Sequence, residues 1–203
     1  MIHSLAARAL LTLCLTLMVA AAAQAFDLAQ LSQQLREPAV IRGQFVQQKH
    51  LRALPQPLVS HGQFVLAREH GLLWSLQQPL QQDYRISGSG IAQRTPSGWE
   101  PTDQQPAAAR QNQLFLAVLG GDTEALQRDF QLDLLGTAAD WTLTLTPRSK
   151  LLQQIFSAIH IQGGTTARLI ELLEIQGDST LLLLESTEVD DQLSAVEQHD
   201  FTH

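Results

Sequence analysis

The sequence predicts an α+β protein in which a few short helices cover a long antiparallel sheet. Two observations support this prediction. Apolar and polar residues alternate over many short runs that end at glycine, proline or a two-residue turn, which is typical of strands joined by hairpins. Several runs, such as Leu181 to Leu184, are apolar on both faces, so each face of the sheet needs a cover. Because only three short helices are available as cover, we expect part of one face to curve around a cavity; helices on one side with a sheet that curls over itself is the alternative.

Residues 1–25 have the pattern of a secretory signal peptide. Arg8 provides the positive charge, an almost unbroken apolar run extends from Ala9 to Ala23, and Ala23-Gln24-Ala25 has the small-x-small form that signal peptidase cleaves. The apolar run is shorter than the roughly 20 residues of a membrane-spanning helix. We therefore expect an exported, soluble protein that begins at Phe26, with residues 26–203 forming a single domain.

Composition narrows the possible functions of the mature chain. The single cysteine, Cys14, lies in the predicted signal peptide, so we expect no thiol nucleophile, disulfide or thiolate metal ligand. Removal of 25 of the 203 residues leaves 178, with 12 Lys and Arg against 20 Asp and Glu, a net charge near −8. This acidic balance argues against binding to nucleic acid or to an anionic membrane surface.

The N-terminal half begins with a helix and continues as a meander of strands. Phe26 to Arg36 has amphipathic spacing, with Asp27 able to cap the helix and Pro38 ending it. Strands are expected at Val40 to Lys49, in two runs within Gly62 to Pro79, and in two short runs, Tyr84 to Ser87 and Ile91 to Arg94. The rhythm of strands is interrupted after Thr95 by three prolines.

The hairpin within Gly62 to Pro79 is the centre of the prediction. Alternation places Phe64, Leu66 and Arg68 on one face of its first strand, and Leu72, Trp74 and Leu76 form the matching row on the second. An arginine therefore ends an apolar row. It is either a rim residue that extends into water or a residue that holds a neighbouring segment closed.

Two further short helices are expected in the middle of the chain. Gln111 to Leu119 has helical spacing and stops at Gly120-Gly121, and Asp122 or Thr123 can cap the next helix, whose main apolar contact is Leu126. Helices this short are unstable alone and must rest on the sheet.

The C-terminal half reads as strands. Phe130 to Leu135 and Trp141 to Thr146 form a strictly alternating hairpin, and three more strands follow at Gln154 to Gln162, Arg168 to Gln176 and Thr180 to Thr187. The acidic pair Asp190-Asp191 is interpreted as a solvated turn in the C-terminal connection.

The sequence contains no recognisable catalytic arrangement. The six histidines after residue 25 lack metal-ligand spacing, and no phosphate-binding or dinucleotide-binding motif is present. Ser89 lies between two glycines in a turn between strands rather than before a helix, so it is a weak nucleophile candidate. We therefore predict a binding protein with no catalytic residue, cofactor or metal; an exported hydrolase is an alternative.

Short motifs along the chain resemble the periplasmic outer-membrane lipoprotein carrier family, LolA. They are Phe45-Val46-Gln47, the run from Gly62 through Arg68 and Trp74 to Pro79, and Leu145-Thr146-Pro147-Arg148. The resemblance implies an incomplete, or half, β-barrel covered by a lid of short helices around a hydrophobic cavity. It also implies a periplasmic carrier that receives lipoproteins from an inner-membrane ABC transporter and delivers them to an outer-membrane receptor. We expect a monomer; a carrier of another lipid, such as a glycolipid or polyene-type lipid, is the alternative.

The resemblance also suggests roles for individual residues. It implies that Arg68 gates the lid, and we expect its partners to be carbonyls around Leu119 to Gly121. The acyl chain is expected to contact apolar side chains of the sheet and of the lid, namely Phe45, Phe64, Leu66, Trp74, Leu76, Leu114, Phe115 and Val118.

Overall fold

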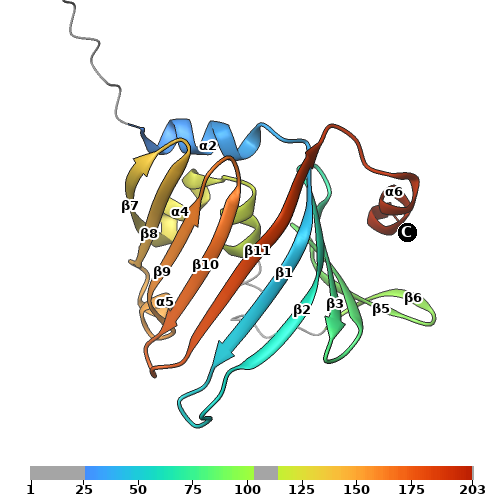
Figure 1. Cartoon of the computed structure of the whole chain (residues 1–203), viewed down its shortest axis with the longest axis horizontal. Helices are drawn as coiled ribbons and strands as arrows, with labels where there is room; N and C mark the ends of the chain where they lie inside the picture. Colours follow the sequence, from blue (N-terminus) through green and yellow to red (C-terminus); the bar gives the residue numbers. More distant parts are fainter. Residues whose placement is uncertain (1–25, 103–113, 203) are drawn as a thin grey trace, which may run out of the picture.

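In the computed structural model, which describes residues 26–102 and 114–202, eleven strands form one sheet in the order β6-β5-β4-β3-β2-β1-β11-β10-β9-β8-β7 (Figure 1). The strands are β1 (Val40–His50), β2 (Leu58–Ala67), β3 (Gly71–Gln78), β4 (Gln82–Ser87), β5 (Gly90–Thr95), β6 (Gly98–Pro101), β7 (Phe130–Thr137), β8 (Asp140–Pro147), β9 (Phe156–Gly163), β10 (Ala167–Glu174) and β11 (Ser179–Asp190). All neighbouring strands are antiparallel. The sheet is curved but not closed, which confirms the predicted half-barrel.

The first and last strands join the two halves of the sheet. β1 to β6 follow one another as a meander, and so do β7 to β11, while β1 pairs with β11 over nearly its whole length. The β1–β11 pairing continues the sheet across its centre, so the chain forms one curved surface rather than two sheets.

Three helical segments cover the inner face of this curve. They are α2 (Leu28–Arg36), the helical residues 114–119, and α4 (Thr123–Asp129). Asp27 caps α2 through a capping box with Gln30, and Asp122 caps α4, as the sequence predicted. The predicted signal peptide and the predicted start of the middle helix at residues 111–113 lie outside the described residues.

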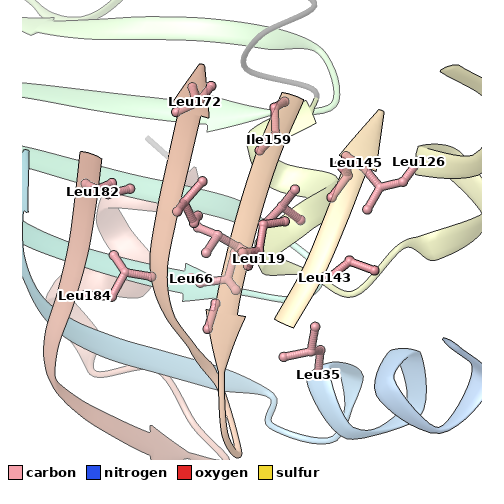
Figure 2. Packing of buried hydrophobic residues seen from close by; sticks show 14 of the residues in the cluster. Leu35, Leu66, Leu119, Leu126, Leu143, Leu145, Ile159, Leu172, Leu182 and Leu184 are labelled. Atoms are coloured by element: carbon pink, nitrogen blue, oxygen red, sulfur yellow. The ribbon is translucent and has the colours of Figure 1, made fainter. Parts of the chain in front are cut away.

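Apolar clusters lie on both faces of the sheet, but the outer one does not reach the run Leu181 to Leu184, whose Leu182 and Leu184 are buried on the inner face while Leu181 and Leu183 stay half-buried outside both clusters. A continuous core lies between the inner face and the covering helices, and Figure 2 shows part of it, with Leu66, Leu119 and Leu126 approaching from different elements. A smaller cluster on the outer face contains Ala67, Leu73 and Phe201. Phe201 belongs to a C-terminal helix, α6 (Ala195–Thr202), which covers this part of the outer face.

Three elements were missed by the prediction. β6 lies in the segment that its prolines marked as irregular, and α5 (Lys150–Gln153) is a single turn capped by Ser149. The third is α6. The interpretation of Asp190-Asp191 as a solvated turn was incomplete, because Asp190 ends β11 and its carboxylate accepts a hydrogen bond of 3.1 Å from Arg42.

Glycines make room for the large aromatic rings of the inner face. Gly62 lies opposite Phe45 on the neighbouring strand, and a Cβ atom there would lie 2.5 Å from the Phe45 ring and 2.1 Å from the Ser75 carbonyl oxygen. Gly43 lies opposite Phe64 in the same way. Each aromatic ring therefore occupies the space that a cross-strand side chain would otherwise fill.

Candidate functional site

A cavity of about 1220 Å³ opens at the edge of the inner-face core. It lies between the end of α2, the β2–β3 and β4–β5 turns, the helical residues 114–119, α4 and α5. Its apolar wall is formed by Leu35, Leu66, Leu114, Leu116, Leu126, Phe130 and Leu152, and its charged lining by Arg36, Arg68, Glu69, Asp122, Arg128 and Asp129. The cavity therefore combines an apolar wall with charged side chains of both signs.

The predicted aromatic residues form a stack beside this cavity. The rings of Phe45 and Trp74 are parallel, with centroids 3.6 Å apart, and Phe64 lies 6.2 Å from Trp74. Phe115, from the helical cover, meets Trp74 edge-on at 5.4 Å. Phe45, Phe64 and Trp74 are buried. The contact between Trp74 and Phe115 joins the sheet directly to its helical cover.

All eight predicted cargo residues belong to or pack against one core cluster, but they differ in their relation to the cavity. Leu66 and Leu114 line the cavity. Leu76 is half-buried, and Val118 is buried beneath the helical cover. The sequence did not single out Leu116 or Leu152 as cavity residues, because each comes from a short helix whose position depends on tertiary packing.

Arg68 lies at the cavity edge, but its partner differs from the predicted one. β2 ends at Ala67, so Arg68 is in the turn, is exposed, and donates from Nη2 to the carbonyl oxygen of Pro38 at 3.1 Å. The predicted partner region, Leu119 to Gly121, is held instead by α2: the Ser32 hydroxyl donates to the Gly121 carbonyl at 2.7 Å. Arg68 therefore contacts the segment just after α2 rather than α4 directly.

An ion-pair network fixes α6 on the outer face. Arg42 Nε and Nη2 donate to the two carboxylate oxygens of Glu197 at 2.6 and 2.7 Å, and Nη1 donates to Asp190. The hydrogen bonds from Arg42 lower the pKa of Glu197 to about 2. The same bonds raise the pKa of Arg42, and the backbone N–H groups of Asp191 and Gln192 lower the pKa of Asp190.

The structure gives little support to the Ser89 alternative. The Ser89 hydroxyl shares a hydrogen bond of 2.8 Å with the Ser87 hydroxyl in the exposed β4–β5 turn. Within residues 26–102 and 114–202, no histidine or carboxylate is hydrogen-bonded to it. The same residues contain no group of three metal-ligating side chains and no helix long and apolar enough to cross a membrane.

The open sheet with a helix-covered inner face is the architecture of a half-barrel binding protein. The chain belongs to the family described as outer membrane lipoprotein carrier protein LolA-like, whose match extends over residues 20–200. No curated protein matches the sequence.

Two solved structures resemble this fold. A LolA superfamily protein from Nitrosomonas europaea is 10% identical, with a TM-score of 0.50 over 90% of this chain and 99% of that one. The complex of MucA and MucB from Pseudomonas aeruginosa contains a chain that is 14% identical, with a TM-score of 0.50 over 84% of this chain. This chain spans 58% of that chain's length. At such low identities the likeness shows the fold alone.

Proposed function

We propose that the protein carries lipid-modified proteins by holding their acyl chains between the inner face of the half-barrel and its helical cover. The observation that carries this proposal is the continuity of the cavity with the inner-face core, through Leu66 on the sheet and Leu114 on the cover. A chain that enters at the cavity can extend along apolar surface without crossing a polar layer.

Energetics favour this use of the site. Each methylene removed from water contributes about 0.8 kcal/mol, so an acyl chain needs an apolar enclosure to cross an aqueous compartment. The residue that would have to give way is Phe115, whose ring is roughly perpendicular to that of Trp74, with 87° between their planes. Replacing that contact by an acyl chain exchanges one apolar contact for another and costs little.

The polar attachments of the cover are weak enough to be reversible. α2 is joined to the start of α4 by the Ser32 to Gly121 hydrogen bond and by the Arg36–Asp122 ion pair of 3.2 Å. That ion pair is about half exposed, and pairs of this kind typically contribute about 0 to 1 kcal/mol. These two bonds lie within the cover; toward the sheet, the side-chain amide of Gln34 donates to the Ala138 carbonyl at 3.1 Å and to the Gly164 carbonyl. None of these bonds involves a buried charge, so the cover can move off the sheet without leaving one unpaired.

The carrier proposal includes a location and partners. The protein acts in the periplasm as a monomer, after removal of residues 1–25, and performs no catalysis. It receives cargo from an inner-membrane ABC transporter and delivers it to an outer-membrane receptor, in keeping with the family to which it belongs. Another lipid in the same cavity is the alternative cargo.

Binding of an environment-sensitive fluorophore with an alkyl tail tests the site. Leu66→Asp places a charge in the proposed binding surface and should weaken binding at least about tenfold. Leu73→Asp is the matched control, because Leu73 is buried to the same extent, 8% exposed, but lies on the outer face. Circular dichroism must show that both variants fold. Equal binding by the two folded variants would remove the inner face from the site.

A further inference from the structure

Four connections gather at one end of the sheet, at the bottom of Figure 1. They are residues 51–57 between β1 and β2, residues 79–81 between β3 and β4, residues 148–155 around α5, and residues 175–178 between β10 and β11. Hydrogen bonds tie three of them together: the Arg52 N–H donates to Asp178 Oδ1 at 2.8 Å, and the Ile175 N–H donates to the Ile155 carbonyl at 3.0 Å.

This end exposes large apolar side chains. Among the described residues, nine large hydrophobic side chains are exposed, and five of them lie here: Leu54, Leu58, Leu80, Leu151 and Ile175. Leu80 is 75% exposed and Ile175 is 55% exposed. Exposed apolar side chains gathered at one end of a molecule are typical of a site that binds a protein or a membrane.

The same end carries basic side chains with few partners. Lys49 and Lys150 are the only lysines in the sequence, and Arg52 and Arg148 accompany them. Acidic residues also lie near this end: Asp178 in the connections, Glu174 at the end of β10, and Asp129, whose backbone carbonyl accepts a hydrogen bond from the Arg148 N–H. In residues 26–102 and 114–202, the side chains of Lys49, Arg148 and Lys150 have no hydrogen bond or ion pair. We call these four basic residues and the five exposed apolar residues the basic apolar rim.

Charges at the other end of the sheet are arranged differently. Arg42 and Arg168 there are paired with acidic side chains, Arg42 with Glu197 and Asp190, and Arg168 with Asp140 at 2.8 Å, whereas the guanidinium of Arg68 donates to a backbone carbonyl. The net negative charge of the chain led us to expect no attraction to an anionic membrane. That charge is a sum over the whole chain, and it does not describe the end of the sheet at which lysine and arginine side chains lack acidic partners among the described residues. At physiological ionic strength charges are screened over about 8 Å, so a surface at the rim responds mainly to the rim's own charges.

We propose that the basic apolar rim docks the protein reversibly on a membrane surface that contains anionic phospholipid. Exposed leucines enter the boundary between headgroups and acyl chains, and neighbouring lysine and arginine side chains pair with phosphate groups. Docking by a few side chains gives contact that is brief rather than permanent. The inference is independent of the proposed cargo, because it concerns surface residues outside the inner-face core.

Vesicle flotation tests the proposal with the protein recovered after export, its N-terminus determined by sequencing. Vesicles of phosphatidylethanolamine and phosphatidylglycerol should retain the protein at low salt, and vesicles of phosphatidylcholine alone should not. Each basic residue replaced, as in Lys49→Gln and Lys150→Gln, should lower the partition coefficient about fivefold. Leu54→Gln combined with Leu80→Gln should lower it about tenfold or more.

The chain offers a matched control for the leucine variants. Leu135 is 73% exposed, close to the 75% of Leu80, but lies on the edge strand β7 outside the rim. Leu135→Gln should therefore leave vesicle binding unchanged. The proposal is overturned if wild-type protein does not bind anionic vesicles at low salt, which would leave the rim to a protein partner, or if Leu135→Gln reduces binding as much as the rim variants do. Added salt should release the wild type, and this measurement requires no variant to fold.

Discussion

The indole ring of Trp74 lies parallel to the phenyl ring of Phe45, with 3.6 Å between their centroids and 16° between their planes. The ring of Phe115, from the helical cover, is roughly perpendicular to the same indole, with 87° between their planes. Trp74 therefore contacts both a neighbouring strand, through Phe45, and the helical cover, through Phe115. An acyl chain bound between sheet and cover, as proposed, would replace the contact with Phe115. This arrangement depends on Gly62, because the Phe45 ring lies where a side chain of residue 62 would begin.

Gly62→Ala should destabilise the fold by about 3 kcal/mol, because its Cβ would lie 2.1 Å from the Ser75 carbonyl oxygen in the paired strand. Urea unfolding followed by circular dichroism measures the change. Gly88→Ala is the control: nothing lies within 4 Å of its Cβ position, and the expected change is below about 0.5 kcal/mol. A Gly62→Ala protein as stable as Gly88→Ala would contradict the packing described for Phe45.

The Arg42–Glu197 pair should make stability depend on pH in acid. The pKa of Glu197 falls from its ordinary value of 4.5 to about 2 in the folded protein. Because the folded pKa is depressed, the pair stabilises the fold above pH 4.5 and loses its contribution as pH falls toward 2. We expect a contribution of about 1 to 2 kcal/mol after allowance for solvent screening.

Urea unfolding at a series of pH values checks this expectation. Glu197→Gln should lower stability at neutral pH and flatten its decline between pH 4.5 and 2. Glu185→Gln, at an exposed carboxylate with no ion pair in the described part of the chain, should change neither. Identical pH profiles for wild type and Glu197→Gln would show that the pair contributes nothing to α6 attachment.

Arg68→Leu should slow the release of cargo about fivefold while leaving its binding intact or tighter. The guanidinium bond to the Pro38 carbonyl holds the end of α2, and α2 in turn holds α4 through Arg36 and Ser32. Because Arg68 is exposed, loss of this hydrogen bond removes at most about 1 kcal/mol from the arrangement in which the cover rests on the sheet. Without this hydrogen bond the closed, empty state is less stable relative to the loaded state, so the carrier releases the bound acyl chain more slowly.

Transfer of an acylated surrogate from the carrier to vesicles measures this release. Arg68→Lys should restore part of the rate, since an ammonium group reaches one carbonyl without the planar geometry of guanidinium. Arg128→Leu is the control, because Arg128 lines the same cavity without a side-chain partner among the described residues. Wild-type transfer rates in Arg68→Leu would make Arg68 a simple rim residue.

Local patterns were sufficient to predict most of the sheet. Strict alternation placed Trp141, Leu143 and Leu145 on one face, and all three are buried. Caps and stops located α2 and α4, since Asp27 and Asp122 perform the roles expected of them. The inner-face cluster was predictable for the same reason: Phe45, Phe64 and Trp74 occupy positions that the strand period assigns to one side.

Features set by distant partners could not be predicted. Only Phe201 of α6 is buried, so its sequence has little helical periodicity, and the position of α6 depends on Arg42, 155 residues away from Glu197. Arg68 was assigned to a strand face because alternation alone does not show that β2 ends at Ala67. The basic apolar rim could not be predicted because its members come from four separate connections and from the ends of two strands, with Lys49 in β1 and Leu58 in β2.

The carrier proposal is tested most directly by a photo-reactive amino acid placed at position 66 or 73 in living cells. Leu66 and Leu73 have the same exposure but face opposite layers of the sheet. Irradiation followed by mass spectrometry should identify acylated proteins cross-linked to position 66 and absent from position 73. Free lipid at position 66 would identify a carrier of another cargo, whereas the absence of any acyl-containing product at position 66 would contradict the account.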